Sequence, residues 1–416
     1  MSAEVAIIKN DCVVLAADSA VTIGNKHYNT DCKLFQLAEN LPVGVMFFGR
    51  GTLCGVDLAT LLKMFRQQIP QTPKQNLKEY PEAFVDFLQS KVETLFPHAL
   101  QVRQLRHDAD SWTNQYLRIL NRAIDHLEDK KYNERKEFLT EEELHAASRR
   151  FIQSEIKELQ ENLSCWSVTD IHKWLATQTS DQIRKSIQDF CTYETMYRSG
   201  EDLIGEQESL LADLFVENYL RSSDREGSSG IVFAGYGTAN VYPSVVCLVL
   251  DGIADNQVKF RYDDDKSLNV SEKLLSDDNE RLNIAEVIPF AQATEMVELY
   301  TRGISFSLYD EIGSRLEAVL ARHKVSAGKS KAIVEEINEA ILEYSRENYS
   351  GALLGNIGLL PPEETAQLAE LLIKLTSFRQ HVSDEAEEVA EPIDVAVISK
   401  ADGFIWHKRK TSIIQH

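Results

Sequence analysis

The sequence predicts an α+β fold in which antiparallel β-sheets are covered by helices. Runs of β-branched and apolar residues typical of strands occur near both ends of the chain and in its middle, and longer segments with helical spacing lie between them. Strands distributed in this way favour an antiparallel arrangement in which N- and C-terminal strands pair. With 416 residues, 43% of them hydrophobic, the chain is long enough for two or three domains or for one core with large insertions.

The first part of the chain predicts four strands followed by a helix. The strands are expected at 4–8, 12–18, 33–37 and 43–48. The polar turn Lys9-Asn10-Asp11 separates the first two as a hairpin connection does. Apolar residues at the spacing of one helical face then follow, at Leu58, Leu61, Leu62 and Phe65. We therefore expect this helix to cover the strands before it.

The middle of the chain changes to long helical patterns, and strands return after a flexible Gly-Ser-Ser-Gly segment at 227–230. Further strands are expected at 231–237, 244–250, 257–262, 393–399 and 403–408, and helices at 290–302, 306–323, 329–347 and 363–382. We interpret residues 70–228 as a helical insertion. The core is then formed by 2–69 and 229–416, with a further helical elaboration near 304–360.

Charge and cysteine content exclude several classes of function. The 65 acidic and 44 basic side chains give a net charge of −21, which opposes binding to nucleic acid and to anionic membranes. The longest apolar runs are too short to span a bilayer, and the N-terminal sequence lacks a basic leader. Six cysteines without a CxxC pair are typical of reduced thiols. We expect a cytoplasmic protein that needs no metal or organic cofactor.

One constellation near the N-terminus carries chemistry. Ser2 stands 16 residues ahead of the aspartate in VVLAADSAVTIGN, and KLF follows with its lysine. This order resembles the proteasome β-type family of N-terminal nucleophile (Ntn) hydrolases, in which an N-terminal threonine precedes a strand, an AAD-S turn and a lysine on the next strand. The resemblance implies that Ser2 is the nucleophile once Met1 is removed, and that Asp18 and Lys33 are its supporting pair.

The chemistry of these side chains explains why the family uses them. A serine hydroxyl is a weak nucleophile unless a base takes its proton, and a free α-amine on the same residue, with a pKa of about 7.7–8.0, can do so. A neighbouring ammonium favours the neutral amine and stabilises the developing alkoxide, and a carboxylate holds that ammonium in place. Taken singly, Ser2 reads as an ordinary N-terminal residue, Asp18 as a turn residue and Lys33 as a solvated strand residue.

The resemblance also implies an oxyanion-binding backbone N–H where a strand runs into the first helix. The matching stretch is GVMFFGRGTLCGVD, in which Gly49 is our candidate because glycine permits close approach and unusual dihedral angles. Strict counting places Phe48 there instead. The resemblance continues through IVFAGYG, VVCLVLDG, the helix PPEETAQLAELLIKL and the strands in IDVAVISKADGFIW. It implies a four-layer αββα sandwich.

Two departures from the family pattern affect the expected activity. The family has an Asp, and a Ser three residues later, after its last long helix, whereas the match here, FRQHVS, has Gln380 and Ser383. The family's mid-chain Ser-Gly segment is replaced by PFAQAT at 289–294. Because these accessory groups help to settle the proton on the α-amine, Gln380 is the main support for an alternative in which the protein keeps the fold and has lost the chemistry.

The sequence therefore predicts an N-terminal-serine hydrolase that cleaves amide bonds, with peptides or proteins as substrates. Two alternatives stay open, a catalytically inactive scaffold or binding subunit and a small-molecule amidase on the same core. Family members form rings that enclose their sites, so the resemblance implies a homo-oligomer and allows an unfoldase partner. No nucleic acid or membrane is expected as a partner. A phosphate-binding loop at 49–55 is disfavoured because its glycine spacing is G-x-G-x-x-x-G.

Overall fold

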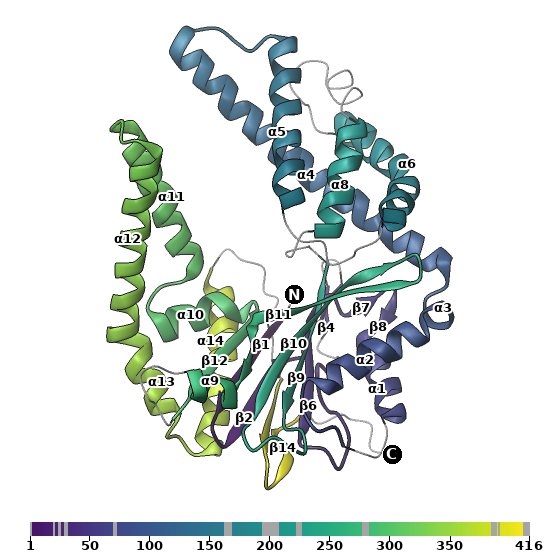
Figure 1. The fold of residues 1–416 in the computed structure, drawn as a ribbon, viewed down its shortest axis with the longest axis vertical. Helices are drawn as coiled ribbons and strands as arrows, with labels where there is room; N and C mark the ends of the chain where they lie inside the picture. Colours follow the sequence, from purple (N-terminus) through teal and green to yellow (C-terminus); the bar gives the residue numbers. More distant parts are fainter. Residues whose placement is uncertain are drawn as a thin grey trace.

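The fold is α+β, as the sequence predicts, with antiparallel sheets and many helices (Figure 1). The computed structural model describes residues 2–19, 21–23, 26–28, 32–69, 73–161, 169–193, 208–221, 227–276, 283–383, 389 and 392–410. Within these ranges, none of the helices has both the length and the apolar character that a membrane span requires.

The first sheet joins the two ends of the chain. Its strands, in spatial order, are β12 (Ala285–Ala291), β1 (Ala3–Lys9), β2 (Cys12–Asp18), β13 (Ile393–Ser399) and β14 (Gly403–Lys408), each antiparallel to its neighbours. Every residue of β1 and β2 is buried, which explains their nearly continuous apolar sequences. The register sets Ile393 opposite Asp18, so the expected pairing of N- and C-terminal strands is confirmed.

Strand β12 corrects one sequence expectation. A helix was expected to begin at residue 290, but this segment completes β12, and helix α10 (Ala293–Arg302) begins only after it. Pro289 lies within the strand opposite Val5. Strand β12 is the outer strand of its sheet, so no strand pairs with it on the side away from β1. On that side Pro289, which has no N–H group, costs no hydrogen bond between strands.

The second sheet packs face to face against the first. Its spatial order is β11 (Gln257–Asn269), β10 (Ser244–Ala254), β9 (Ser229–Gly235), β6 (Val43–Gly49) and β5 (Leu34–Gln36), again antiparallel throughout. One buried apolar cluster contains side chains from both sheets, among them Leu15, Ile288 and Ala396 from the first and Met46, Val232 and Cys247 from the second. This cluster forms the core between the sheets.

Helices cover the outer face of each sheet. On the second sheet lie α1 (Leu58–Gln68) and α2 (Glu79–Ser90), where the ring of Phe84 is 6.2 Å from that of Phe233 on β9. On the first sheet lie α10 and α14 (Pro362–Val382), whose Val297 and Ile373 share a cluster with Val5 of β1. Although α2 falls inside the expected insertion 70–228, its side chains belong to the core.

Two groups of helices extend away from the sheets in Figure 1. The first group follows the short helix α3 (Val92–Leu95) and comprises α4 (His98–Arg135), α5 (Glu141–Glu161), α6 (Thr169–Tyr193) and α8 (Glu208–Arg221). These four helices share an apolar cluster of their own. The second is the pair α11 (Phe306–Arg322) and α12 (Ala327–Ser345), followed by a π-helical turn (Arg346–Ser350) and α13 (Gly351–Ile357). The remaining elements are β3 (Val21–Ile23), β4 (Lys26–Tyr28), β7 (Thr52–Leu53), β8 (Val56–Asp57) and α9 (Val270–Ser276).

Candidate active site

A buried ion pair joins the two sheets near the start of the chain. Asp18 is the last residue of β2, and Lys33 directly precedes β5 of the other sheet. Lys33 Nζ donates a hydrogen bond of 2.7 Å to Asp18 Oδ1, and both residues are buried. The same oxygen accepts a 3.1 Å hydrogen bond from the backbone N–H of Ala3. A carboxylate held in this way fixes the position of the ammonium beside the first residues of β1.

Ser2 lies directly before this contact. Its carbonyl oxygen accepts a 2.9 Å hydrogen bond from the backbone N–H of Gln292, which anchors the start of β1 to the end of β12. The Ser2 hydroxyl is buried and has no hydrogen-bond partner among the described residues. This hydroxyl interacts with the carboxyl of Glu4, without the alignment of a hydrogen bond.

Glu4 is a member of this cluster that the sequence analysis missed. Its side chain is fully buried, and Oε1 lies 3.7 Å from Lys33 Nζ. Burial raises the pKa of Glu4 to about 8, although the nearby Lys33 ammonium and, more weakly, the Ser2 hydroxyl oppose the rise. Neither carboxyl oxygen forms an aligned hydrogen bond in the described part of the chain. Near neutral pH the protonated carboxyl therefore predominates, leaving the ammonium with Asp18 as its main counter-ion.

A signal for Glu4 was present in the sequence. The strand AEVAIIK is otherwise apolar until its final lysine, and β1 is buried on both faces. An acidic side chain in such a strand has to be buried, and a buried carboxyl needs either a proton or a cation beside it. The identity of that cation, Lys33, could not be inferred because it comes from the opposite sheet.

Gly49 ends β6 in a conformation that requires glycine. Its φ angle is 80°, and a Cβ atom at this position would approach the backbone oxygen of Ser228 to 2.5 Å. It pairs with Ser229 on β9. No hydrogen bond in the described residues joins its amide to Ser2. The neighbouring Phe48 instead packs its ring 5.1 Å from the ring of Phe290.

Gln380 and Ser383, which the resemblance aligned with an accessory Asp and an accessory Ser, lie at different depths in the structure. Gln380 is buried near the end of α14, where its Oε1 accepts a 3.1 Å hydrogen bond from Val389 N–H and its Nε2 donates to Gln292 Oε1 at 3.4 Å. Since Gln292 binds the carbonyl of Ser2, Gln380 is linked to the start of β1 through one intervening residue. Ser383 is exposed, and its hydroxyl donates to the carbonyl oxygen of Gln380 at 3.4 Å.

The segment 289–294 contributes to the site through Gln292, a residue that sequence reasoning did not single out. A cavity of about 270 Å³ lies beside Gln292 and Gln380 and is also lined by Glu295, Thr376 and Arg379. Ser2 is not among the side chains that line this cavity. The cavity therefore opens beside Gln292 and Gln380 rather than at the Ser2 hydroxyl.

Cys12, Cys32, Cys54 and Cys247 form no disulfide bonds in the described part of the chain. Burial raises the pKa of Cys12 and of Cys54 to about 12. Such thiols are poor nucleophiles because the thiolate form is scarce. Cys165 and the side chain of Cys191 lie outside the described residues. Within the described ranges, no group of three or more His, Cys, Asp or Glu side chains could hold a metal ion.

Comparison with known proteins gives no family assignment. No protein-family model matches the sequence, and a search of curated proteins finds no matching relative. The function therefore has to be argued from the geometry around Ser2.

Proposed function

We propose that the protein is an Ntn-type hydrolase that cleaves amide bonds in peptides, built on a four-layer αββα sandwich. The observation that carries the proposal is the buried Lys33–Asp18 pair, whose carboxylate also accepts the backbone N–H of Ala3, the residue that follows Ser2. The two face-to-face sheets, each with helices on its outer face, support the sandwich assignment. The proposal includes assembly of copies of this chain into a closed ring.

The proposed reaction begins after removal of Met1, which converts the Ser2 backbone nitrogen into an amine. This amine takes the hydroxyl proton as Oγ attacks the carbonyl carbon of the substrate. The Lys33 ammonium keeps the amine neutral by charge repulsion and stabilises the developing alkoxide, while Asp18 holds the ammonium in position. The amine then passes its proton to the leaving nitrogen, and water releases the acyl group from Ser2.

The protonated state of Glu4 suits this mechanism. A second carboxylate beside Lys33 would draw the ammonium away from the alkoxide and would favour a charged amine. With a pKa of about 8, Glu4 is mostly neutral at pH 7 and does not compete with Ser2 Oγ for the positive charge. In the proposed mechanism the oxyanion donor is the backbone N–H of Gly49. A substrate would reach this donor at the exposed end of β6.

The test combines intact mass with a covalent probe. A peptide epoxyketone reacts with both the hydroxyl and the amine of an N-terminal serine, so we expect one adduct per chain on protein that has lost Met1. Ser2→Ala should abolish both the adduct and the hydrolysis of a fluorogenic peptide library. The control Ser271→Ala, at an exposed position on α9, should label and hydrolyse as the wild type does.

A non-catalytic scaffold or binding subunit is the second candidate. It is favoured by Gln380, whose amide cannot supply the charge of the family's aspartate and is already bound to Val389. Folded protein that retains Met1, or that lacks Met1 and neither labels nor cleaves peptides, would exclude the N-terminal-serine peptidase and leave the scaffold or binding subunit and the small-molecule amidase.

A further inference from the structure

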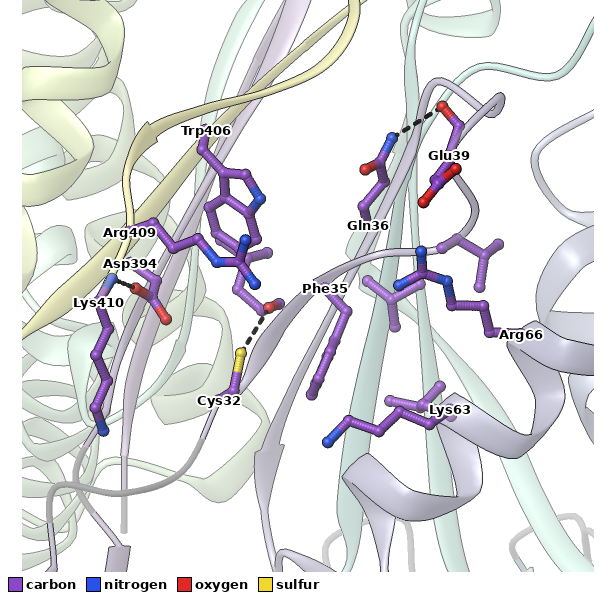
Figure 2. Close-up of a pocket in the computed structure, with 14 residues that line it drawn as sticks. Cys32, Phe35, Gln36, Glu39, Lys63, Arg66, Asp394, Trp406, Arg409 and Lys410 are labelled. Atoms are coloured by element: carbon purple, nitrogen blue, oxygen red, sulfur yellow. Dashed lines mark hydrogen bonds between the residues drawn. The ribbon is translucent and has the colours of Figure 1, made fainter. Parts of the chain in front are cut away.

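A second cavity, of about 480 Å³, lies where the outer edges of the two sheets meet (Figure 2). Strand β5 is the last strand of one sheet and β14 the last strand of the other, and the cavity is bounded by β5, by helix α1 and by the residues that follow β14. Cavities of this volume are typical of sites for small organic ligands. Its lining does not include Ser2, Glu4, Asp18 or Lys33.

Positive side chains line the cavity from two sides. Lys63 and Arg66 come from α1, and Arg409 comes from the segment after β14. None of these three side chains forms an ion pair with a carboxylate in the part of the chain that the structure describes. In a protein of net charge −21, three cations around one cavity that pair with no carboxylate of the described residues are a marked local reversal of charge.

The carboxylates of the cavity do not cancel this charge. Asp394 is buried, and its Oδ1 accepts a 2.6 Å hydrogen bond from the backbone N–H of Lys410. Burial also raises the pKa of Asp394, which disfavours its charged form. Glu39, the other acidic residue of the lining, is exposed.

Two aromatic rings belong to the apolar part of the lining, and each lies close to one of the cations. The Arg409 guanidinium lies 5.0 Å from the centre of the Trp406 ring, and Lys63 Nζ lies 5.8 Å from the centre of the Phe35 ring. Figure 2 shows Arg66 and Arg409 extending from opposite sides toward the space above Phe35. In this view Phe35 lies below the space and Trp406 lies above Arg409, so a ligand there would meet aromatic rings and a guanidinium group on either side.

We propose that this cavity binds a small organic anion with a flat apolar body and one phosphate or carboxylate group. The oxyanion is held between Arg66 and Arg409, because guanidinium groups bind carboxylate and phosphate through paired hydrogen bonds. The apolar body packs against Phe35 and Trp406. This site is separate from Ser2 and does not depend on the protein being a hydrolase.

Isothermal titration calorimetry with phenyl phosphate and with benzoate tests the proposal. The compound that binds more tightly shows whether the site prefers a phosphate or a carboxylate group. We expect one binding site per chain, affinity that falls with added salt, and weaker binding of inorganic phosphate, which lacks the apolar body. Arg66→Gln and Arg409→Gln should each weaken binding about tenfold. Arg322→Gln, which removes the same charge from an exposed position on α11, should leave the affinity unchanged.

Three results would overturn the proposal. The first is that neither organic anion binds at concentrations up to about 10 mM. The second is that uncharged phenol binds as tightly as the anions, and the third is that the Arg66→Gln/Arg409→Gln double variant keeps wild-type affinity. Circular dichroism of each variant shows whether lost binding reflects lost folding. Both arginine side chains are exposed at the cavity rim, so we expect the substitutions to preserve the fold.

Discussion

Replacing Glu4 by glutamine should remove a large part of the pH dependence of stability. The folded protein raises the pKa of this carboxyl from 4.5 to about 8, mainly through burial. A group with a higher pKa in the folded state binds its proton more tightly there. Its contribution to stability is therefore complete below the unfolded pKa and is lost as the pH rises through the folded pKa.

The size of the effect follows from the two pKa values. At about 1.4 kcal/mol for each pH unit, a rise from 4.5 to about 8 corresponds to roughly 5 kcal/mol of unfolding free energy. We expect the wild type to lose up to this amount, relative to Glu4→Gln, between about pH 4 and about pH 9. Glutamine keeps the shape of the side chain and carries no charge at any of these pH values.

Urea unfolding followed by circular dichroism, repeated across this pH range, measures the effect for both proteins. Because groups distant from Glu4 titrate alike in both proteins, the difference between the two pH profiles reports Glu4 together with the Lys33 and Asp18 charges that interact with it. Glu134→Gln, at an exposed position on α4, is the control and should give a profile parallel to that of the wild type. Parallel profiles for wild type and Glu4→Gln would refute the reasoning that burial holds the proton on Glu4.

Three other substitutions test the structure around the site, each by chemical denaturation. Lys33→Met should destabilise the protein by about 3–5 kcal/mol because it leaves the Asp18 carboxylate buried without a cation. Adding Asp18→Asn should recover part of the loss, and equal stability of wild type and Lys33→Met would contradict the buried pair. Gly49→Ala should cost about 1–3 kcal/mol, since its φ angle of 80° and the oxygen of Ser228 leave no room for a methyl group. Asp57→Ala should cost about 1 kcal/mol by removing the 2.7 Å hydrogen bond that caps α1, whereas Asp57→Asn should retain most of it.

Much of the fold could be predicted from the sequence because local patterns determine it. The segment 12–18 forms β2 as expected, and the helical spacing that begins at Leu58 forms α1 with its apolar side chains against the second sheet. Strand β12 could not be predicted in the same way. Pro289 argues against a strand, and only its place at the edge of a sheet, which the sequence does not reveal, makes it acceptable.

The candidate site was less predictable than the fold because its members come from both sheets. The spacing of Asp18 and Lys33 allowed a contact between adjacent strands, and the structure places their charged atoms 2.7 Å apart. The third charged group, Glu4, and the link from Ser2 to Gln292 depend on how β1 is placed between β2 and β12. The cationic cavity was also missed, because Arg66 and Arg409 are brought together only by the meeting of two sheet edges.

The central position of β2 between β1 and β13 has a consequence for biosynthesis. Asp18 emerges early from the ribosome, but the strand that completes its sheet begins only at Ile393. At typical translation rates of about 5–20 residues per second, the β2 edge of the early hairpin stays unpaired for roughly twenty seconds to more than a minute. A nascent chain in this state can recruit chaperones or associate with other strands. The sheet that carries Asp18 is therefore completed only after the long stretch of chain between Asp18 and Ile393 has been made.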